Sequence, residues 1–345
     1  MNIVKSHSQV DSRPAPAPRG DRLRRWLGRG LLVFVLLGAA GAVYQSLATA
    51  RDARNFLPPG QMVDVDGRQM HINCMGQGSP TVILEQGGGG NALFWFLVQP
   101  EVARSTRVCA YDRAGMGWSD PGPDPRNGQQ IANELHTLLH NANIPGPYVL
   151  AGWSYGGLFV RSYAMQYPEE VAGLALLDAS HPEQWTRTAQ GQATYQNDSR
   201  NYTATRFLAR LGLLRLFPLP FTAPPAGLSP QLVAQFKAVM NTTKLWDTTE
   251  AESRFILDTM AQVRQAGHLG DLPLMVVTAG ENPGADGQWA VYQDELAELS
   301  TNSVHLILEG AQHHSLVLDT EDSLASSSAI LRVVAAVRAG APLNP

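Results

Sequence analysis

The sequence has little of what marks several common protein classes. Its 345 residues include only two cysteines, Cys74 and Cys109, which are too few for a disulfide scaffold. It has no C-x-x-C pair and no H-E-x-x-H segment, so neither a structural zinc site nor a zinc-protease site is predicted. The net charge is only −4, and no basic stripe interleaved with aromatic residues follows residue 60, so we expect no nucleic-acid partner.

The composition that remains is that of a protein with a sizeable core. Hydrophobic residues make up 44% of the chain and charged residues 16%, which is ordinary for a globular protein. The length suits one large α/β domain with an insertion, or two small domains. Two interpretations of the cysteines stay open: two buried thiols within strands, or one disulfide.

The first 60 residues differ in composition from the rest of the chain. Residues 12–20 are rich in proline, alanine and arginine, which cannot build a core, so we expect residues 1–30 to be disordered. An apolar run at residues 31–50 approaches the roughly 20 residues needed to cross a bilayer. The basic residues just before it are Arg19, Arg22, Arg24, Arg25 and Arg29. This order predicts a transmembrane anchor at residues 31–50, a linker at 51–60, and an extracytoplasmic domain at 61–345.

A cleaved signal peptide is the competing interpretation of this segment. A basic stretch, a short apolar stretch and the A-x-A pattern Ala48-Thr49-Ala50 also describe such a peptide. The basic stretch is long for a signal peptide, which favours an uncleaved, membrane-bound anchor. Both interpretations export the domain to a compartment in which a disulfide persists.

From residue 61 onward, short apolar segments alternate with segments of helical periodicity. An Asp66-Gly67 pair between two alternating runs predicts a β-hairpin. The strands that we expect cover residues 62–65, 68–74, 81–85, 107–111, 148–152, 171–177, 274–278 and 304–308, and the helices 127–142, 158–167 and 322–338. Such alternation predicts a mostly parallel sheet wrapped by helices. The rhythm breaks at residues 183–270, a mostly helical, proline-interrupted segment that we interpret as an inserted lid.

The central motif is a G-x-S-x-G, centred on Ser154, between an apolar strand and an amphipathic helix. A nucleophilic serine must sit on a sharp strand-to-helix turn, and the flanking glycines, Gly152 and Gly156, leave room for that turn. The N-terminus of the following helix favours negative charge that develops at the reaction centre. We therefore predict Ser154 as a nucleophile. The alternative is a glycine-rich turn with a structural role only.

A serine nucleophile needs two backbone N–H donors for the oxyanion. One is expected from Tyr155, directly after the nucleophile. The other is expected from the glycine run after the third strand, where Gly88 is our assignment and Gly87 or Gly89 are alternatives. A flexible loop is the competing interpretation. The spacing is not that of a G-x-G-x-x-G dinucleotide site.

The general base is expected to be a histidine that follows the last strand, and both His313 and His314 lie there. The acid that orients it follows the sixth or the seventh strand. Asp178 ends the sixth strand, at the edge of a parallel sheet where active sites form. Glu281 and Asp286 lie in the loop after the seventh.

These segments resemble the α/β-hydrolase fold family from about residue 62 to residue 338. The resemblance is carried by the glycine run, by G-W-S-Y-G-G, by G-A-Q-H, and by the D-R-A-G-M-G-W-S-D stretch that starts at Asp112. It implies an eight-stranded, mostly parallel sheet flanked by helices, with a helical lid insertion. The D-R-x-G stretch is typical of a branch with esterases, C–C hydrolases and proline iminopeptidases. Dehalogenases and epoxide hydrolases of that branch carry an aspartate nucleophile, so Ser154 argues against both.

The sequence departs from the family pattern at two places. The common His-Gly before the oxyanion loop is Gln86-Gly87, which keeps the amide donors but removes a supporting side chain. The usual aspartate after the seventh strand is absent, which favours Asp178 as the acid, with Glu281 second and Asp286 third. The family pattern G-A-x-H-x-S-L favours His313 as the base.

The family topology also bears on the two cysteines. It places the second strand antiparallel beside the fourth, so that Cys74 and Cys109 would lie on neighbouring strands. A disulfide between them is therefore a hypothesis.

The resemblance implies acyl transfer to water without a metal or cofactor. We predict a serine hydrolase that cleaves a small ester or amide substrate. An acyltransferase or an iminopeptidase-like peptidase would use the same triad, and a membrane-tethered binding protein without catalysis is a third alternative. The lid would line an apolar substrate pocket with aromatic and aliphatic side chains, namely Trp185, Phe207, Leu211, Phe217 and Phe221. The sequence does not predict the oligomeric state.

Overall fold

An eight-stranded sheet forms the centre of the protein, in a computed structural model that describes residues 19–343 except 220–221 and 226. The strands are β1 (Gln61–Val65), β2 (Arg68–Met75), β3 (Thr81–Glu85), β4 (Val108–Tyr111), β5 (Tyr148–Trp153), β6 (Val171–Leu177), β7 (Leu274–Ala279) and β8 (Ser303–Leu308). Their order in the sheet is β1-β2-β4-β3-β5-β6-β7-β8. Only β2 runs antiparallel to its neighbours, and every other adjacent pair is parallel. The predicted α/β class with an eight-stranded, mostly parallel sheet is confirmed.

The predicted hairpin joins β1 to β2. Val65 pairs with Arg68, which leaves a two-residue turn of Asp66 and Gly67. Both turn residues have positive φ, 53° and 80°, as a type I′ turn requires.

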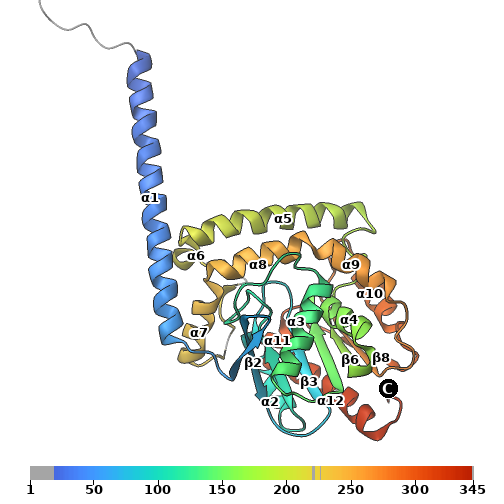
Figure 1. The fold of residues 1–345 in the computed structure, drawn as a ribbon. Helices are drawn as coiled ribbons and strands as arrows, with labels where there is room; N and C mark the ends of the chain where they lie inside the picture. The colour runs from blue at the N-terminus through green and yellow to red at the C-terminus, as the bar shows by residue number, and fades with distance from the viewer. Residues whose placement is uncertain (1–18, 220–221, 226, 344–345) are drawn as a thin grey trace, which may run out of the picture.

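Helices cover both faces of the sheet (Figure 1). The α2 helix (Val98–Val102) and the α12 helix (Thr320–Ala339) pack on one face, and α3 (Gly128–Asn141) and α4 (Gly156–Gln166) on the other. Strand side chains point alternately to the two sides, so Val82 belongs to the first hydrophobic core and Ile83 to the second. The short elements at the rim are η1 (Ala92–Trp95), η2 (Pro168–Glu170), α10 (Trp289–Ala297) and α11 (Ser315–Leu318).

Between β6 and β7, the described residues form five further helices, within the segment predicted as mostly helical. They are α5 (Ala189–Arg210), α6 (Leu213–Leu216), α7 (Pro230–Met240), α8 (Thr243–Arg254) and α9 (Ile256–Gln265). In Figure 1 the long α5 helix lies over α8, above the sheet. We refer to α5 through α9 as the insertion.

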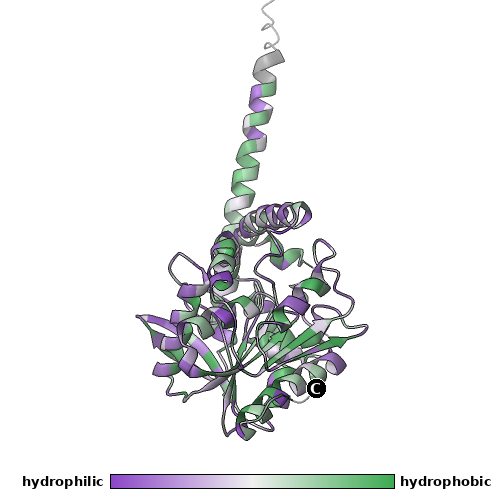
Figure 2. Cartoon of the chain, turned by 90° about the vertical axis from the view of Figure 1, so that its right-hand side faces the viewer, coloured by the Kyte–Doolittle hydropathy of each residue, from purple (hydrophilic) through white to green (hydrophobic). Residues whose placement is uncertain are grey.

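The N-terminal segment differs from its prediction. Residues 1–18 lie outside the described residues, but the α1 helix (Arg19–Asn55) covers the rest of the expected disordered segment and half of the expected linker. Leucine, alanine and arginine favour a helix, and no proline interrupts this stretch. Residues 23–55 are long and apolar enough to cross a membrane, and only 11% of their most apolar window is buried against the protein. Figure 2 shows α1 standing away from the domain and coloured hydrophobic along much of its length. Its large apolar side chains are exposed.

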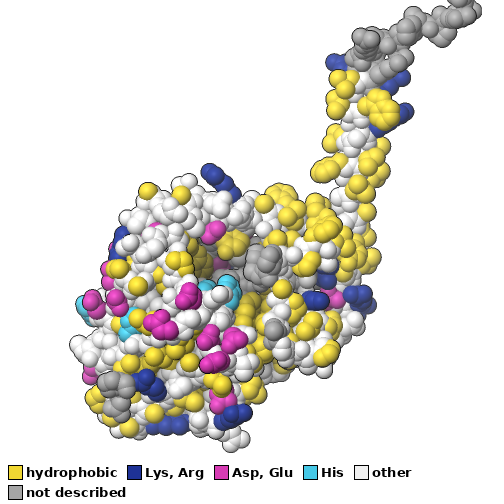
Figure 3. Space-filling view, turned by 180° about the vertical axis from the view of Figure 1, so that it is seen from behind, with side chains coloured by type: hydrophobic (Ala, Val, Ile, Leu, Met, Phe, Trp, Pro, Cys, Tyr) yellow, Lys and Arg dark blue, Asp and Glu magenta, His cyan; other side chains and the backbone are white. Residues whose placement is uncertain are grey.

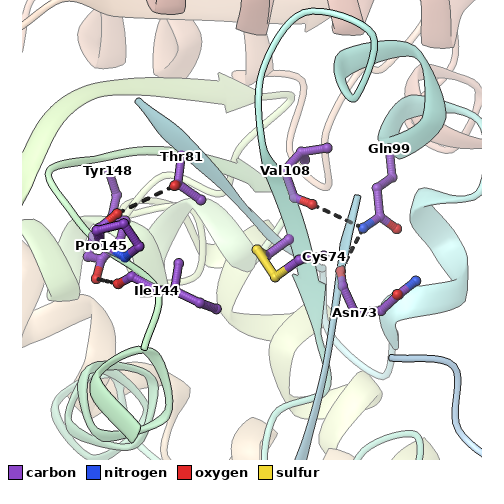
Figure 4. Close-up of a disulfide and its surroundings, with 9 residues drawn as sticks. Asn73, Cys74, Thr81, Gln99, Val108, Ile144, Pro145 and Tyr148 are labelled. Carbon is purple, nitrogen blue, oxygen red and sulfur yellow. Dashed lines mark hydrogen bonds between the residues drawn. A yellow bond between two sulfur atoms is a disulfide. The ribbon is translucent and has the colours of Figure 1, made fainter. Parts of the chain in front are cut away.

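Cys74 and Cys109 form a disulfide (Figure 4). The two residues are directly paired in the antiparallel register of β2 and β4, and their Cα atoms lie 4.0 Å apart. The interpretation of two free thiols is therefore wrong, and the disulfide hypothesis is confirmed.

Candidate active site

Ser154 sits on a tight turn between β5 and α4. Its φ is 56°, in the left-handed region that a serine rarely adopts, and its N–H donates to the Leu177 carbonyl at 3.2 Å. The flanking glycines permit this turn. A Cβ on Gly152 would lie 2.6 Å from the backbone of Gly156, and one on Gly156 would lie 2.3 Å from the Glu85 carbonyl oxygen. The strained serine thus projects from the carboxyl end of β5, as a nucleophile elbow requires.

A cavity of about 490 Å³ opens above this turn. Ser154, His313 and His314 all line it, together with residues of the insertion. Figure 3 shows the hollow from behind, with histidine side chains in it. The predicted nucleophile and both candidate bases therefore share one space, although the serine follows β5 and the histidines lie in the loop after β8.

His313 makes a direct contact with Asp178. Its Nδ1 atom lies 2.5 Å from Oδ2 of this fully buried carboxylate. Because a carboxylate only accepts hydrogen bonds, Nδ1 carries the hydrogen and Nε2 is left free to accept a proton. The Trp153 ring stacks on His313 at 5.0 Å between centroids, and its Nε1 donates to the His313 carbonyl oxygen at 2.9 Å. These contacts fix the orientation of the imidazole.

Three further donors hold Asp178, which has a φ of 43° at the end of β6. Its Oδ1 accepts from Trp289 Nε1 at 2.7 Å and from the Ala279 N–H at 3.0 Å. Its Oδ2 accepts from Asn282 Nδ2 at 2.6 Å. Asn282 and Trp289 were not found from the sequence. Asn282 lies in the loop after β7, one position before the place where the family pattern has its aspartate, so this loop supplies an amide in place of the acid.

The two alternative acids do not contact either histidine. Glu281 is exposed. Asp286 accepts hydrogen bonds from Thr188 Oγ1 at 2.7 Å and from the Tyr292 hydroxyl at 2.9 Å. The structure thus brings Asp178 to His313 and leaves Glu281 and Asp286 apart from them.

His314 differs from His313 in its surroundings. Its ring lies at right angles to that of His313, with 5.2 Å between centroids, and has no hydrogen bond to a carboxylate among the described residues. Burial lowers the pKa of His314, and the neighbouring His313 lowers it further. His314 is therefore a neutral wall of the cavity at neutral pH.

The Gly88 backbone packs against the Tyr155 ring beside the serine. A Cβ on Gly88 would lie 2.9 Å from the Tyr155 ring, and one on Gly87 would lie 3.0 Å from Ser154 Cβ. Within the described part of the chain, neither the Gly88 N–H nor the Tyr155 N–H donates to a protein acceptor. Both amides are thus available to an oxygen atom bound near Ser154.

Arg113 supports the glycine loop, a role that the sequence did not reveal. This fully buried guanidinium donates to the carbonyl oxygens of Gln86 at 2.8 Å and Gly87 at 3.0 Å. It also pairs with Glu85 at 2.6 Å and with Glu252 of α8 at 2.8 Å. The Gln86 side chain itself has no partner within the described residues. Arg113 therefore replaces the support that the family's histidine would supply.

Burial raises the pKa of Glu85 to about 7, although the charge of Arg113 acts in the opposite direction. The Tyr111 hydroxyl also donates to this carboxylate. Burial lowers the pKa of Arg113, but its carboxylate partners Glu252 and Glu85 together raise it by more, so Arg113 stays charged. No group of three or more metal-ligating side chains occurs among the described residues.

The predicted substrate pocket is only partly correct. Trp185 lines the cavity, as do Phe94, Met240 and Trp246. Phe207 and Phe217 do not, since they are 58% and 71% exposed, and Leu211 packs against α1. Phe221 lies outside the described residues. The aromatic residues of a helical insertion can face either side, and the sequence pattern does not say which.

Comparisons with known proteins agree with this architecture. A family model described as alpha/beta hydrolase fold matches residues 80–319. An uncharacterized protein of Schizosaccharomyces pombe is 25% identical over 293 residues, which cover 74% of this chain and 52% of that relative. The chain thus matches about half of that relative's length.

Two solved structures illustrate the likeness in fold. A loop variant of a haloalkane dehalogenase from Bradyrhizobium elkanii has a TM-score of 0.64 at 18% identity and covers 81% of this chain and 97% of its own. A thermophilic esterase from Thermogutta terrifontis has a TM-score of 0.60 at 17% identity, and the match covers 80% of this chain and 98% of the esterase. At such low identity the likeness concerns the fold alone.

Proposed function

Because the chain belongs to the α/β-hydrolase fold family, we propose that it is a serine hydrolase that cleaves a carboxylic ester or amide. Ser154 is the nucleophile, His313 the general base and Asp178 the acid that orients it. The observation that carries this proposal is the 2.5 Å contact between Asp178 and His313 in the cavity that Ser154 also lines.

The reaction proceeds through an acyl-enzyme. Ser154 Oγ attacks the substrate carbonyl carbon while His313 Nε2 takes the hydroxyl proton, and the Gly88 and Tyr155 amides stabilise the oxyanion. His313 then gives the proton to the leaving alcohol or amine. Water, deprotonated by His313, attacks the acyl carbon and releases the acid and free Ser154. Asp178 holds the imidazole tautomer and stabilises its cation.

The shape and lining of the cavity support a substrate with an apolar part. Phe94, Trp153, Met240 and Trp246 supply apolar walls beside Ser154. Polar side chains, among them Asp198 and Asn201 of α5, line other parts of the same cavity. The insertion acts as a lid, because helices α5 and α8 contribute cavity walls. Dehalogenase and epoxide-hydrolase reactions are disfavoured, since the family members that carry them out use an aspartate where this chain has Ser154.

The α1 helix anchors the enzyme in a membrane. Its length and its exposed apolar residues support this, and the arginines at its start favour an extracytoplasmic catalytic domain. The disulfide between Cys74 and Cys109 fits an oxidising compartment. Cleavage after residues 48–50 would instead cut inside α1, where Ala48 is buried.

The test is covalent labelling of the intact protein with a fluorophosphonate probe. Wild type should be labelled, and Ser154→Ala should not. Ser180→Ala is the matched control, because Ser180 lines the same cavity but makes no hydrogen bond to a histidine among the described residues. The assignment of Ser154 would be contradicted if both variants were still labelled, or if both lost their labelling.

Two kinds of product assay separate the alternatives. A panel of esters with graded acyl length, run beside Ser154→Ala, measures hydrolysis. Added alcohols or peptides reveal an acyltransferase or a peptidase by their products. A folded wild-type protein that reacts with neither probe nor ester would indicate a membrane-tethered binding protein.

A further inference from the structure

Four large apolar side chains are exposed where α5 meets α6. They are Phe207 (58% exposed), Leu208 (39%), Leu216 (59%) and Phe217 (71%), and we call them the apolar shoulder. The sequence around them has the same character: residues 211–228 contain one charged residue, Arg215. Exposed apolar groups gathered in this way mark an interaction surface.

The shoulder is fixed against α1. A Cβ on Gly41 would lie 2.4 Å from the Leu211 carbonyl oxygen, and one on Gly212 would lie 3.0 Å from the Tyr44 ring. Arg215 turns inward and pairs with Asp52 of α1 at 2.6 Å, so the one charge of this segment is neutralised. Close backbone packing and a buried ion pair hold the two elements in one register.

This register determines the depth of the shoulder relative to a membrane. Residues 30–37, eight in number, separate Arg29 from Gly38, where the contact with Leu211 begins. At about 1.5 Å per residue they span only about 12 Å, whereas a bilayer core is about 30 Å thick. A membrane-spanning α1 must therefore continue in the hydrocarbon beyond Gly38, which brings the bilayer to the level of the shoulder.

We propose that the apolar shoulder is a second membrane contact, which enters the leaflet nearest the domain. The proposal rests on the proposed anchoring by α1. The hydrophobic surface continues from α1 onto the shoulder, and hydrophobic side chains gather between α1 and the hollow of the active site (Figure 3). Thr205 of α5 lines the cavity only two residues before Phe207. The cavity thus lies beside the leaflet and takes an ester with an apolar chain directly from the lipid.

The depth of the shoulder can be measured on the full chain in phosphatidylcholine nanodiscs. A nitroxide is attached through Phe217→Cys, which is selective because Cys74 and Cys109 are bonded to each other. Collisions with oxygen, which partitions into lipid, are compared with collisions with a water-soluble nickel chelate. We expect the ratio of oxygen collisions to chelate collisions to be severalfold higher at position 217 than at the control Leu324→Cys, which is 49% exposed on α12. Equal chelate access at 217 and 324 would overturn the proposal.

A third label separates this proposal from the anchoring. Leu37→Cys lies on the exposed part of α1, at 68% exposure. If oxygen dominates at 37 but the chelate reaches 217, the anchor stands and the shoulder proposal fails. If the chelate reaches 37 as well, the anchoring fails and the shoulder proposal fails with it.

A kinetic test addresses the route of the substrate. In Phe207→Ser with Phe217→Ser, hydrolysis of a long-chain ester embedded in the nanodisc should fall severalfold, while hydrolysis of a soluble acetyl ester stays unchanged. Leu324→Ser should change neither rate. An equal fall for both esters, or no fall for either, would contradict entry from the lipid.

Discussion

Asp178 Oδ2 and His313 Nδ1 lie 2.5 Å apart across 135 residues of sequence. This pairing predicts that Asp178→Asn loses most activity, because an amide can donate to Nδ1 and so favour the wrong imidazole tautomer. We expect kcat for a soluble ester to fall about 10³- to 10⁴-fold, with a smaller change in KM. Steady-state kinetics measures both constants.

The chain offers a matched control for this change. Asp286→Asn removes the same charge from a carboxylate that binds Thr188 and Tyr292 instead of a histidine. It should keep nearly all of the activity. A larger loss in Asp286→Asn than in Asp178→Asn would transfer the acid role to the loop after β7.

Much of the site could be predicted from the sequence because reactive groups follow the carboxyl ends of parallel strands. Ser154 follows β5 directly, Asp178 follows β6 directly, and His313 comes soon after β8. In the structure Ser154 and His313 line one cavity, and Asp178 contacts His313 from behind its wall. Residues that act through others leave no such signal. Trp289 is the first residue of α10, and no motif in the sequence indicates that its indole reaches Asp178.

The outer parts of the fold were less predictable for a related reason. The proline and arginine residues before the apolar run predicted a disordered segment up to residue 30, whereas the helix begins at Arg19. Aromatic residues in the insertion indicated a pocket, but Phe207 and Phe217 face outward. Whether an apolar side chain turns to the core or to a membrane depends on tertiary contacts, such as those of Leu211 with α1.

Arg113 is predicted to position the oxyanion loop. Arg113→Lys keeps the charge between Glu85 and Glu252 but cannot also hold the Gln86 and Gly87 carbonyls with a planar fork. We expect kcat to fall about 10- to 100-fold with KM nearly constant, because a displaced amide stabilises the oxyanion less. Rates of fluorophosphonate labelling should fall in parallel.

The control for Arg113 must separate positioning from folding. Arg126→Lys is suitable, since Arg126 is also buried and pairs with Glu134, and it makes no hydrogen bond to the glycine loop among the described residues. Both variants should lower Tm, but only Arg113→Lys should slow labelling. If Arg113→Lys lowered Tm but left kcat unchanged, Arg113 would stabilise the fold without positioning the oxyanion loop.

The disulfide is predicted to stabilise the domain. Cys74 and Cys109 are separated by 35 residues, and closing a loop of that length contributes about 3–4 kcal/mol to the free energy of unfolding. Cys74→Ala with Cys109→Ala should lose about this amount in denaturant titrations. Reduced wild type is the control, because it keeps both side chains and should be equally destabilised. Equal thiol counts with and without reductant, in denaturant, would contradict the bond.

His181 makes stability depend on pH. Burial lowers its pKa to about 4 in the folded protein, although Glu295 at 3.2 Å acts in the opposite direction. In the unfolded chain its pKa is about 6.5, so between these values the unfolded state binds one more proton and the free energy of unfolding falls as the pH falls. We expect the free energy of unfolding to fall by about 1–2 kcal/mol between pH 7 and pH 5 because of His181.

Urea titrations across this range should show a shallower pH dependence for His181→Gln, whereas His140→Gln, at an exposed position, should follow wild type. Parallel curves for His181→Gln and wild type would show that His181 takes up its proton in the folded state as readily as in the unfolded chain.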